Sequence, residues 1–80
     1  MDNDAMKPGR FLKLQTGRRK MAWIAEHISA GHKIMVCTYT RATIYKSVGQ
    51  FELGKSGSVY AQHGRRWDCI DGCALRAQTD

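Results

Sequence analysis

The sequence predicts an α+β fold, in which one N-terminal amphipathic helix packs on an antiparallel β-meander of four to five short strands. Apolar residues recur with a clear helical spacing in one segment, and from Ile34 onward the pattern alternates at every second residue. Closely spaced turn signals then follow, as is typical of a meander. The length of 80 residues fits one small domain. Curling of the sheet toward a small barrel is an open alternative within this class.

The helix is expected over residues 18–30. Four apolar residues share one stripe at i, i+3, i+4 and i+7: Met21, Ile24, Ala25 and Ile28. Thr16 is the expected N-cap, and Gly31 stands where a left-handed C-terminal cap is favoured. Trp23 and His27 fall roughly opposite the apolar stripe.

Strands are expected over residues 34–48, 50–53, 58–62, 66–70 and 73–76. The first segment is long for one strand, so we expect a bend or tight turn near Thr40 and Arg41. Residues 10–15 fit a short strand or a first helical turn, and both readings stay open. Residues 1–9 are expected to form a mobile arm, residues 10–76 the domain, and residues 77–80 a C-terminal tail.

Positive charge is concentrated between residues 7 and 66, where twelve lysines and arginines stand against two acids, Glu26 and Glu52. The other five acids lie outside this segment, and the whole chain, with 13 lysines and arginines against 7 acids, has a net charge of +6. A field of this density attracts polyanions at long range. Nucleic acid is therefore the first expected partner, and an acidic protein surface is the second.

Composition also indicates the setting. No apolar run approaches the roughly 20 residues that span a bilayer, and no secretory signal is expected at the N-terminus. Three cysteines, an odd number, favour free thiols in a reducing compartment. We therefore expect a cytoplasmic protein of a bacterial or other host cell that makes no membrane contact.

A basic and aromatic face on the sheet is the first candidate site. Six residues are its expected members: Tyr39, Arg41, Tyr45, Lys46, Arg65 and Arg66. By alternation, Tyr39, Arg41 and Tyr45 share one side of a strand. Rings that stack on bases and cations that follow phosphates are typical of proteins that bind single-stranded nucleic acid. Alternatively, the tyrosines are ordinary core or rim residues. Trp67 is expected to point inward, on the same side as Cys69.

The start of the helix is the second candidate site. Arg18, Arg19 and Lys20 occupy the first turn, where the helix dipole disfavours positive charge. A basic helix start can hold phosphate, and arginines beside an exposed Trp23 could equally anchor a protein partner. A third reading is that Trp23 packs against the N-terminal segment around Phe11. All three readings stay open.

No cofactor, metal site or catalytic site is expected. Four possible zinc ligands are spread through the chain: Cys37, His63, Cys69 and Cys73. They include no C-x-x-C pair, so they give a weak zinc signal. A small RNase built on His63, Arg65 and Arg66 is a minor alternative. We therefore expect a protein that is not an enzyme.

Three segments in the second half of the chain carry a resemblance: residues 36–43 (VCTYTRAT), 59–60 (VY) and 64–70 (GRRWDCI). With them, residues 33–76 resemble small uncharacterised proteins encoded by phages and prophages. The resemblance implies a phage accessory protein, a class that includes DNA-binding regulators and inhibitors of host or defence proteins such as anti-CRISPRs. It carries over no functional residue.

Two functions are expected from these observations. The first is non-catalytic binding of nucleic acid, DNA or RNA, through a basic, aromatic-containing face. The second is inhibition of a host or phage-defence factor, with the basic face docked on an acidic protein surface. The partner's identity, the strandedness of the nucleic acid and the oligomeric state stay open.

Overall fold

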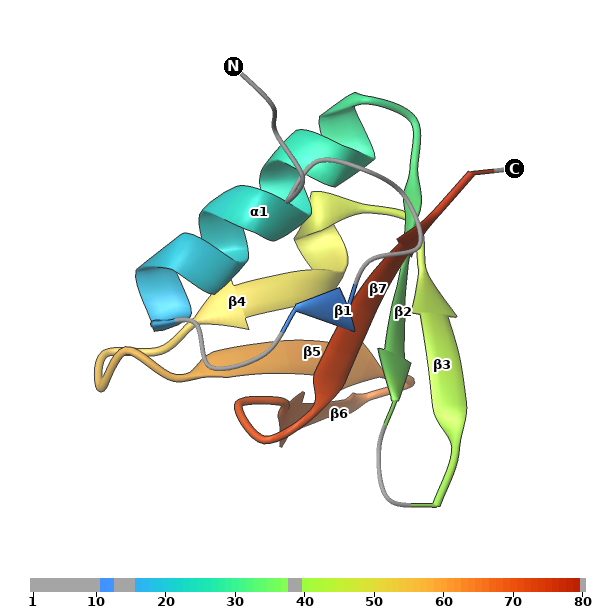
Figure 1. Ribbon diagram of the computed structural model, residues 1–80. Coiled ribbons are helices and arrows are strands. Elements are labelled where there is room, and N and C mark those ends of the chain that lie inside the picture. The colour runs from blue at the N-terminus through green and yellow to red at the C-terminus, as the bar shows by residue number, and fades with distance from the viewer. Residues whose placement is uncertain (1–10, 13–15, 38–39, 80) are drawn as a thin grey trace.

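One helix packs on two antiparallel sheets in the computed structural model, which describes residues 11–12 (backbone only), 16–37 and 40–79 (Figure 1). The first sheet has the order β1-β7-β2-β3: β1 (Phe11–Leu12), β7 (Ala74–Gln78), β2 (Lys33–Cys37) and β3 (Ala42–Tyr45). The second has the order β4-β5-β6: β4 (Phe51–Leu53), β5 (Val59–His63) and β6 (Arg66–Cys69). The predicted α+β class is confirmed, and the described strands do not close into a barrel.

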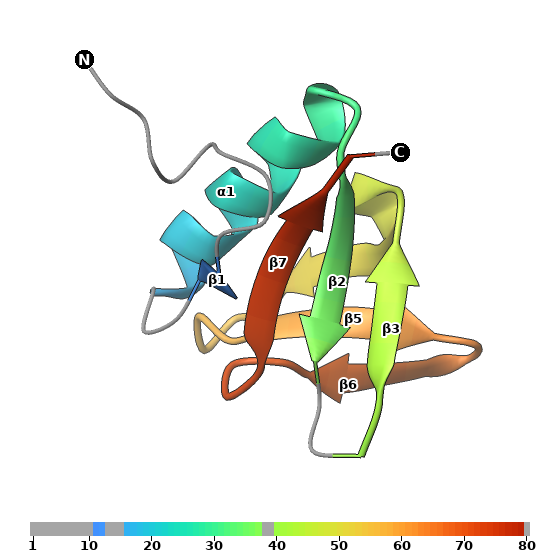
Figure 2. The same ribbon diagram turned by 45° about the vertical axis from the view of Figure 1, so that its right-hand side comes forward.

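The strands of the two sheets run across one another, and α1 (Gly17–Ser29) lies along one side of both (Figures 1 and 2). The helix packs against β2, β4 and β5, and it also touches the short 3₁₀ helix η2 (Val48–Gln50). The expected arm at residues 1–9 lies outside the described residues. The backbone at 11–12 forms a strand, and the last strand continues past residue 76 to Gln78. No helix among the described residues is long and apolar enough to cross a membrane.

The predicted meander holds within β2-β3 and within β4-β5-β6, but the chain changes sheet between β3 and β4 and again between β6 and β7. β7 pairs with β2, far away in the sequence, with Leu75 opposite Val36 and Ala77 opposite Ile34. All four side chains are buried, so this pairing places two apolar stripes side by side on the core face of the first sheet. If β7 had instead formed a hairpin with β6, the apolar residues of β7 and β2 would not lie side by side.

The caps of α1 are as predicted. Thr16 is the N-cap, and its hydroxyl oxygen accepts a hydrogen bond from the Arg19 amide at 3.4 Å. The helix ends at Ser29, and Gly31 follows with φ at +88°, a conformation that suits glycine. The local sequence therefore sets both ends of the helix.

The buried face of α1 differs from the predicted stripe by a rotation of about one residue. Four of its side chains are buried: Lys20, Trp23, Ile24 and His27. The expectation that Trp23 and His27 lie opposite the core is wrong, because an indole removes far more apolar surface from water than an alanine does. The buried His27 also makes a hydrogen bond with His32: their Nδ1 atoms lie 2.7 Å apart, so one ring donates and the other accepts.

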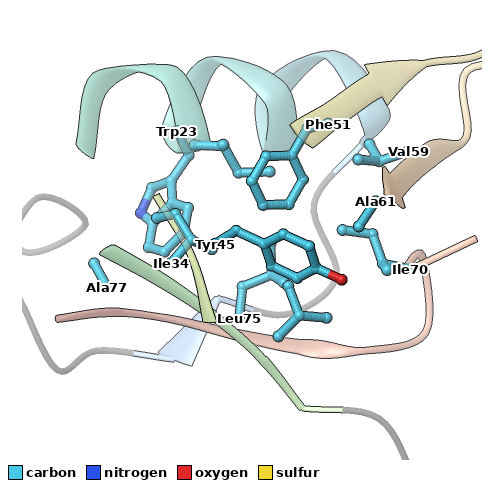
Figure 3. Close-up of a cluster of buried hydrophobic side chains, with 11 residues drawn as sticks. Trp23, Ile34, Tyr45, Phe51, Val59, Ala61, Ile70, Leu75 and Ala77 are labelled. Atoms are coloured by element: carbon cyan, nitrogen blue, oxygen red, sulfur yellow. The ribbon is translucent and has the colours of Figure 1, made fainter. Parts of the chain in front are cut away.

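The core fills the space between the helix and the two sheets (Figure 3). Tyr45 and Phe51 pack in a tilted arrangement with ring centroids 5.0 Å apart. Tyr45 stands directly opposite Ile34, so both side chains leave the strands on the buried face. The sequence prediction applied one alternation to residues 34–48 without a break at the turn near Thr40, which put Tyr45 and Ile34 on different sides. The pairing of the two strands across that turn puts both on the buried side.

The buried Lys20 ties the helix to the turn between β6 and β7. Its side chain is 2% exposed, and Nζ donates to the carbonyl oxygens of Asp71 at 3.0 Å and Ile70 at 3.4 Å. The carboxylate of Asp71 in turn accepts a hydrogen bond from the Val59 amide at 2.8 Å. This bond lowers the pKa of Asp71, and Lys20 contributes in the same direction.

Replacing Lys20 with methionine tests this tie. The Lys20→Met protein should unfold with a free energy about 1–2 kcal/mol lower than wild type, because two partly buried carbonyls lose their donor. The melting temperature should fall by about 4–8 °C for each kcal/mol. Lys55→Met, at an exposed turn position, is the control and should change stability by less than about 0.5 kcal/mol. Equal stability of the two variants would contradict the tie.

The Asp71 bond predicts a pH dependence. Because the folded-state pKa of Asp71 is lowered, its contribution is present above the ordinary aspartate range and is lost as pH falls through the folded-state pKa. Urea unfolding of wild type and Asp71→Asn at about pH 6 and pH 2 measures this directly. The wild type should be more stable at about pH 6, and the difference should shrink at about pH 2. A difference that does not change with pH would show that the charge has no role.

Candidate nucleic-acid interface

The solvent-facing side of the second sheet carries two rows of exposed or half-buried side chains, which we call the outer face: Glu52, Tyr60, Gln62, Trp67 and Cys69. Glu52, Tyr60 and Cys69 stand opposite one another across the three strands, and Gln62 stands opposite Trp67. The alternating residues of β5, Val59 and Ala61, are buried in the core. Alternation along a strand therefore turns the outer face toward solvent.

Trp67 lies on this outer face with 41% of its surface exposed, so the expectation that it points inward with Cys69 is wrong. The reason is the short loop between β5 and β6. Gly64, with φ at +63°, opens a two-residue loop that pairs His63 with Arg66. This register places Asp68 opposite the buried Ala61 and turns Trp67 outward.

Tyr60 is held against the turn that follows β4. A Cβ atom on Gly54 would lie 2.9 Å from Tyr60 Cε1, so the ring occupies the space that a side chain at residue 54 would need. By alternation, residues 52 and 54 face the same side of the sheet as Tyr60. Tyr60 stands opposite Glu52 in the pairing, and its ring lies over Gly54. The half-buried ring is thereby fixed on the sheet with part of its surface in solvent.

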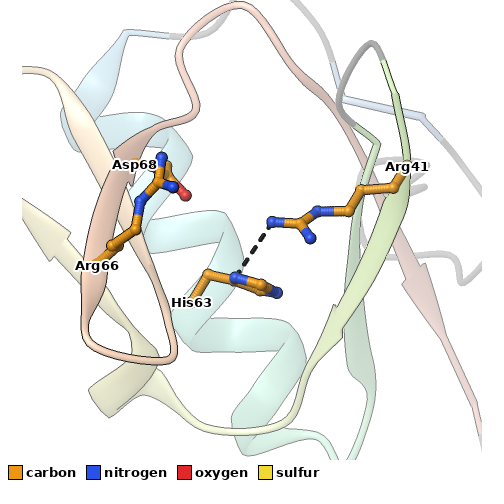
Figure 4. A network of polar contacts seen from close by, with 4 residues as sticks. All are labelled: Arg41, His63, Arg66 and Asp68. Carbon is orange, nitrogen blue, oxygen red and sulfur yellow. Dashed lines mark hydrogen bonds and ion pairs between the residues drawn. The ribbon is translucent and has the colours of Figure 1, made fainter.

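Three arginines and a histidine lie where the first sheet meets the β5–β6 hairpin. We call this group the junction cluster: Arg41, His63, Arg65 and Arg66. Arg41 Nη2 donates to His63 Nδ1 at 3.1 Å (Figure 4). Because a guanidinium group can only donate, Nδ1 is the acceptor in this contact. The bond joins the start of β3 to the end of β5.

Arg66 makes an ion pair that leaves it accessible. Its Nη2 lies 3.2 Å from Asp68 Oδ1, and the two side chains are 80% and 39% exposed. An ion pair this exposed contributes little to stability, so the guanidinium group can exchange partners at low cost.

Behind this pair, burial and the Asp68 charge raise the pKa of the Tyr45 hydroxyl. Tyr45 is therefore a neutral core residue at the base of the cluster.

A second group of cations lies at the start of the helix. This helix-start cluster consists of Arg18 and Arg19 in the first turn of α1 and Lys55 in the β4–β5 turn, and all three are exposed. The two segments touch through backbone, because Gly17 lies so close to the Gly57 carbonyl that no side chain fits at residue 17. The helix start and the turn therefore present their cations from adjacent segments.

The two clusters lie at opposite ends of β5. β5 follows directly on the β4–β5 turn that carries Lys55, and it ends at His63 in the junction cluster (Figures 1 and 2). Tyr60 is near the first end of β5, and Trp67 stands opposite Gln62 near the second. The rings of Tyr60 and Trp67 lie on the outer face, whereas the register turns His63 and Arg66 to the other face of the sheet, on the side of Ala61 and Asp68.

The structure divides the residues predicted from sequence into three groups. Six of them are exposed: Arg18, Arg19, Arg41, Lys46, Arg65 and Arg66. Lys20, Trp23 and Tyr45 are buried, so the expectation that they lie on a binding surface is wrong. Lys20 bonds backbone carbonyls, and the two aromatic residues form part of the core. Tyr39 lies outside the described residues.

Sequence reasoning missed Tyr60, Trp67 and Lys55. The signal for Trp67 was available in the chain, because a glycine-led two-residue loop and the apolar pair Val59 and Ala61 together fix which residues of β6 point outward. Nothing local indicates that Lys55 shares one end of the molecule with the helix start, because that placement depends on how α1 packs.

The cysteines and histidines do not gather into a metal site within the described part of the chain, where no group of three or more metal-binding side chains forms. Cys37 is on the first sheet and Cys69 on the second. Cys73 packs against the core, and burial raises the pKa of its thiol. The thiol of Cys73 is therefore less reactive than an ordinary cysteine.

Comparisons with protein-family models, with curated proteins and with solved structures each find no match for this chain. The function must therefore be argued from the surface itself.

The different exposure of the two tryptophans is directly measurable. Trp67→Phe should shift the emission maximum to shorter wavelength and reduce quenching by acrylamide, because the remaining Trp23 is only 7% exposed. A circular dichroism spectrum equal to that of wild type confirms that the variant is folded. Unchanged quenching after the substitution would mean that Trp67 is not on the outer face.

Proposed function

We propose that this protein binds single-stranded nucleic acid, without catalysis, on the outer face of its second sheet. The observation that supports this most strongly is the pair of outward rings, Tyr60 and Trp67, on a hairpin whose two ends carry exposed cations. A base stacked on an aromatic side chain gains about 1–3 kcal/mol, and the cations supply attraction to the phosphates.

The geometry favours a short strand with its backbone anchored at the two ends. The five residues of β5 span about 16 Å, so the outer face along this strand accommodates only a few nucleotides. Arg18, Arg19 and Lys55 would hold phosphate at one end, with Arg65 of the β5–β6 loop at the other. Stacking on a sheet requires bases that are not already stacked in a duplex, so single strands are favoured.

Binding to a fluorescent hexanucleotide tests this function. Fluorescence anisotropy at about 50 mM salt should detect binding, and Trp67→Ala and Tyr60→Ala should each weaken it roughly tenfold. Ile44→Ala is the matched control, because Ile44 is an equally exposed apolar side chain (46%) on the other sheet. The duplex of the same sequence should bind more weakly than the single strand.

The charges should set the salt dependence of the same measurement. Replacing both Arg65 and Arg66 with alanine should reduce the log–log salt slope by about 0.7 for each phosphate that these side chains neutralise in the wild type. The oligonucleotide should be recovered intact, and its cleavage would contradict the non-catalytic assignment. No detectable affinity at about 50 mM salt, or full affinity in Trp67→Ala, would refute the proposal.

A protein partner is the second candidate, favoured by the edge strand β3. This strand has one neighbour in the described sheet, exposes Ile44, and is flanked by the exposed Arg41 and Lys46. An acidic extended segment would complement both its charge and its open edge, as expected for an inhibitor of a host or phage-defence factor. Partner capture that survives nuclease treatment and is abolished in Ile44→Asp would favour this candidate.

A further inference from the structure

Glu52 is an unexpected residue in the middle of the proposed interface. It is one of two acids in a segment with twelve cations, it is exposed, and it lies on the outer face beside Tyr60. A carboxylate repels phosphate, so the nucleic-acid backbone would avoid this position. Whatever approaches Glu52 in a bound strand must therefore present hydrogen-bond donors rather than phosphate oxygens.

The register brings Glu52 close to any base stacked on Tyr60. The two residues stand directly opposite each other, a relation that places Cβ atoms about 4.5–5.5 Å apart. The Tyr60 ring lies over Gly54, the next outward position after Glu52 on the same side of the sheet. A base that stacks there presents one edge toward the Glu52 oxygens.

The chemistry of an ionised carboxylate selects among bases. It has two oxygens that only accept, so it pairs best with two adjacent donors. Guanine has such a pair on its Watson–Crick edge, N1–H and the N2 amino group. Adenine and cytosine present one amino group beside an acceptor nitrogen, and thymine and uracil present one N–H between two carbonyls. In single strands this edge is open to the protein.

We propose that Glu52 makes the Tyr60 position a guanine-reading subsite, an inference that rests on the proposed function. The position at Trp67 lacks this selectivity, because its opposite residue is Gln62, whose amide both donates and accepts. The protein therefore prefers one guanine within a short strand and tolerates any base at the neighbouring stacking position. The subsite reads DNA and RNA alike, since the edge that it contacts is the same in both.

Hexanucleotides with one variable base test this subsite. The host is a thymidine hexamer with guanine, inosine, adenine or cytosine at one inner position, since a single guanine per strand disfavours quadruplex formation. Wild type should bind the guanine strand roughly tenfold more tightly than the plain host. Inosine lacks the N2 amino group, so it should lose most of this gain. A uridine series distinguishes RNA from DNA.

Glu52→Gln is the decisive variant, because it keeps the shape of the side chain and removes the charge. Its ratio of guanine to inosine affinity should fall to about one, while the plain host binds as well as before or more tightly because a charge that repels phosphate is gone. Glu26→Gln, on the exposed face of the helix, is the matched control and should keep the guanine preference.

The outcomes separate the two proposals. Binding of all hexamers with equal affinity, or a guanine preference that persists in Glu52→Gln, overturns the guanine subsite and leaves the proposed function standing. Absence of binding to every hexamer by a wild-type protein that is folded by circular dichroism overturns both. A guanine preference that the Glu52→Gln substitution removes supports the subsite.

Discussion

The structure depends on one turn, where the buried ammonium group of Lys20 meets the carbonyls of Ile70 and Asp71. The helix contributes the cation, the turn joins β6 of the second sheet to β7 of the first, and the Asp71 carboxylate accepts the Val59 amide. A chain of 80 residues has a small core and a small margin of stability. Because few side chains are available for the core, these hydrogen bonds, which join the helix to both sheets at one point, add to the stability that the core supplies.

This constraint also shapes the surface. With Val59 held by Asp71, β5 buries Val59 and Ala61, and its alternating residues must face solvent together with their partners on β6. The helix start is packed against the β4–β5 turn, which places its cations near one end of β5. The hydrogen bond between Arg41 and His63 fixes the other end. The contacts that hold the core together therefore also determine which side chains of the second sheet face solvent. The side chains of the outer face are not part of the buried core.

Features that depend on neighbouring residues could be predicted from the sequence. Thr16 caps the helix through the amide three residues on, and Gly31 ends it by adopting a conformation that other residues rarely take. Features that depend on distant contacts could not. The rotation of α1 that buries Trp23 is decided by the sheets that it meets, and the pairing of β7 with β2 joins segments that are far apart in the sequence. For the candidate site, the exposed arginines were predictable from charge, whereas Tyr45 required the register across a hairpin and Trp67 the register after Gly64.

Chemical-shift mapping with a single-stranded hexanucleotide tests the central claim most directly, because it reports which surface binds. The account predicts that the perturbed amides and side chains cluster on β4, β5 and β6, with the Trp67 indole among the most affected and β2 and β7 unchanged. Shifts centred on β3 and its neighbours in the first sheet, or no shifts at protein concentrations in the millimolar range, would contradict it.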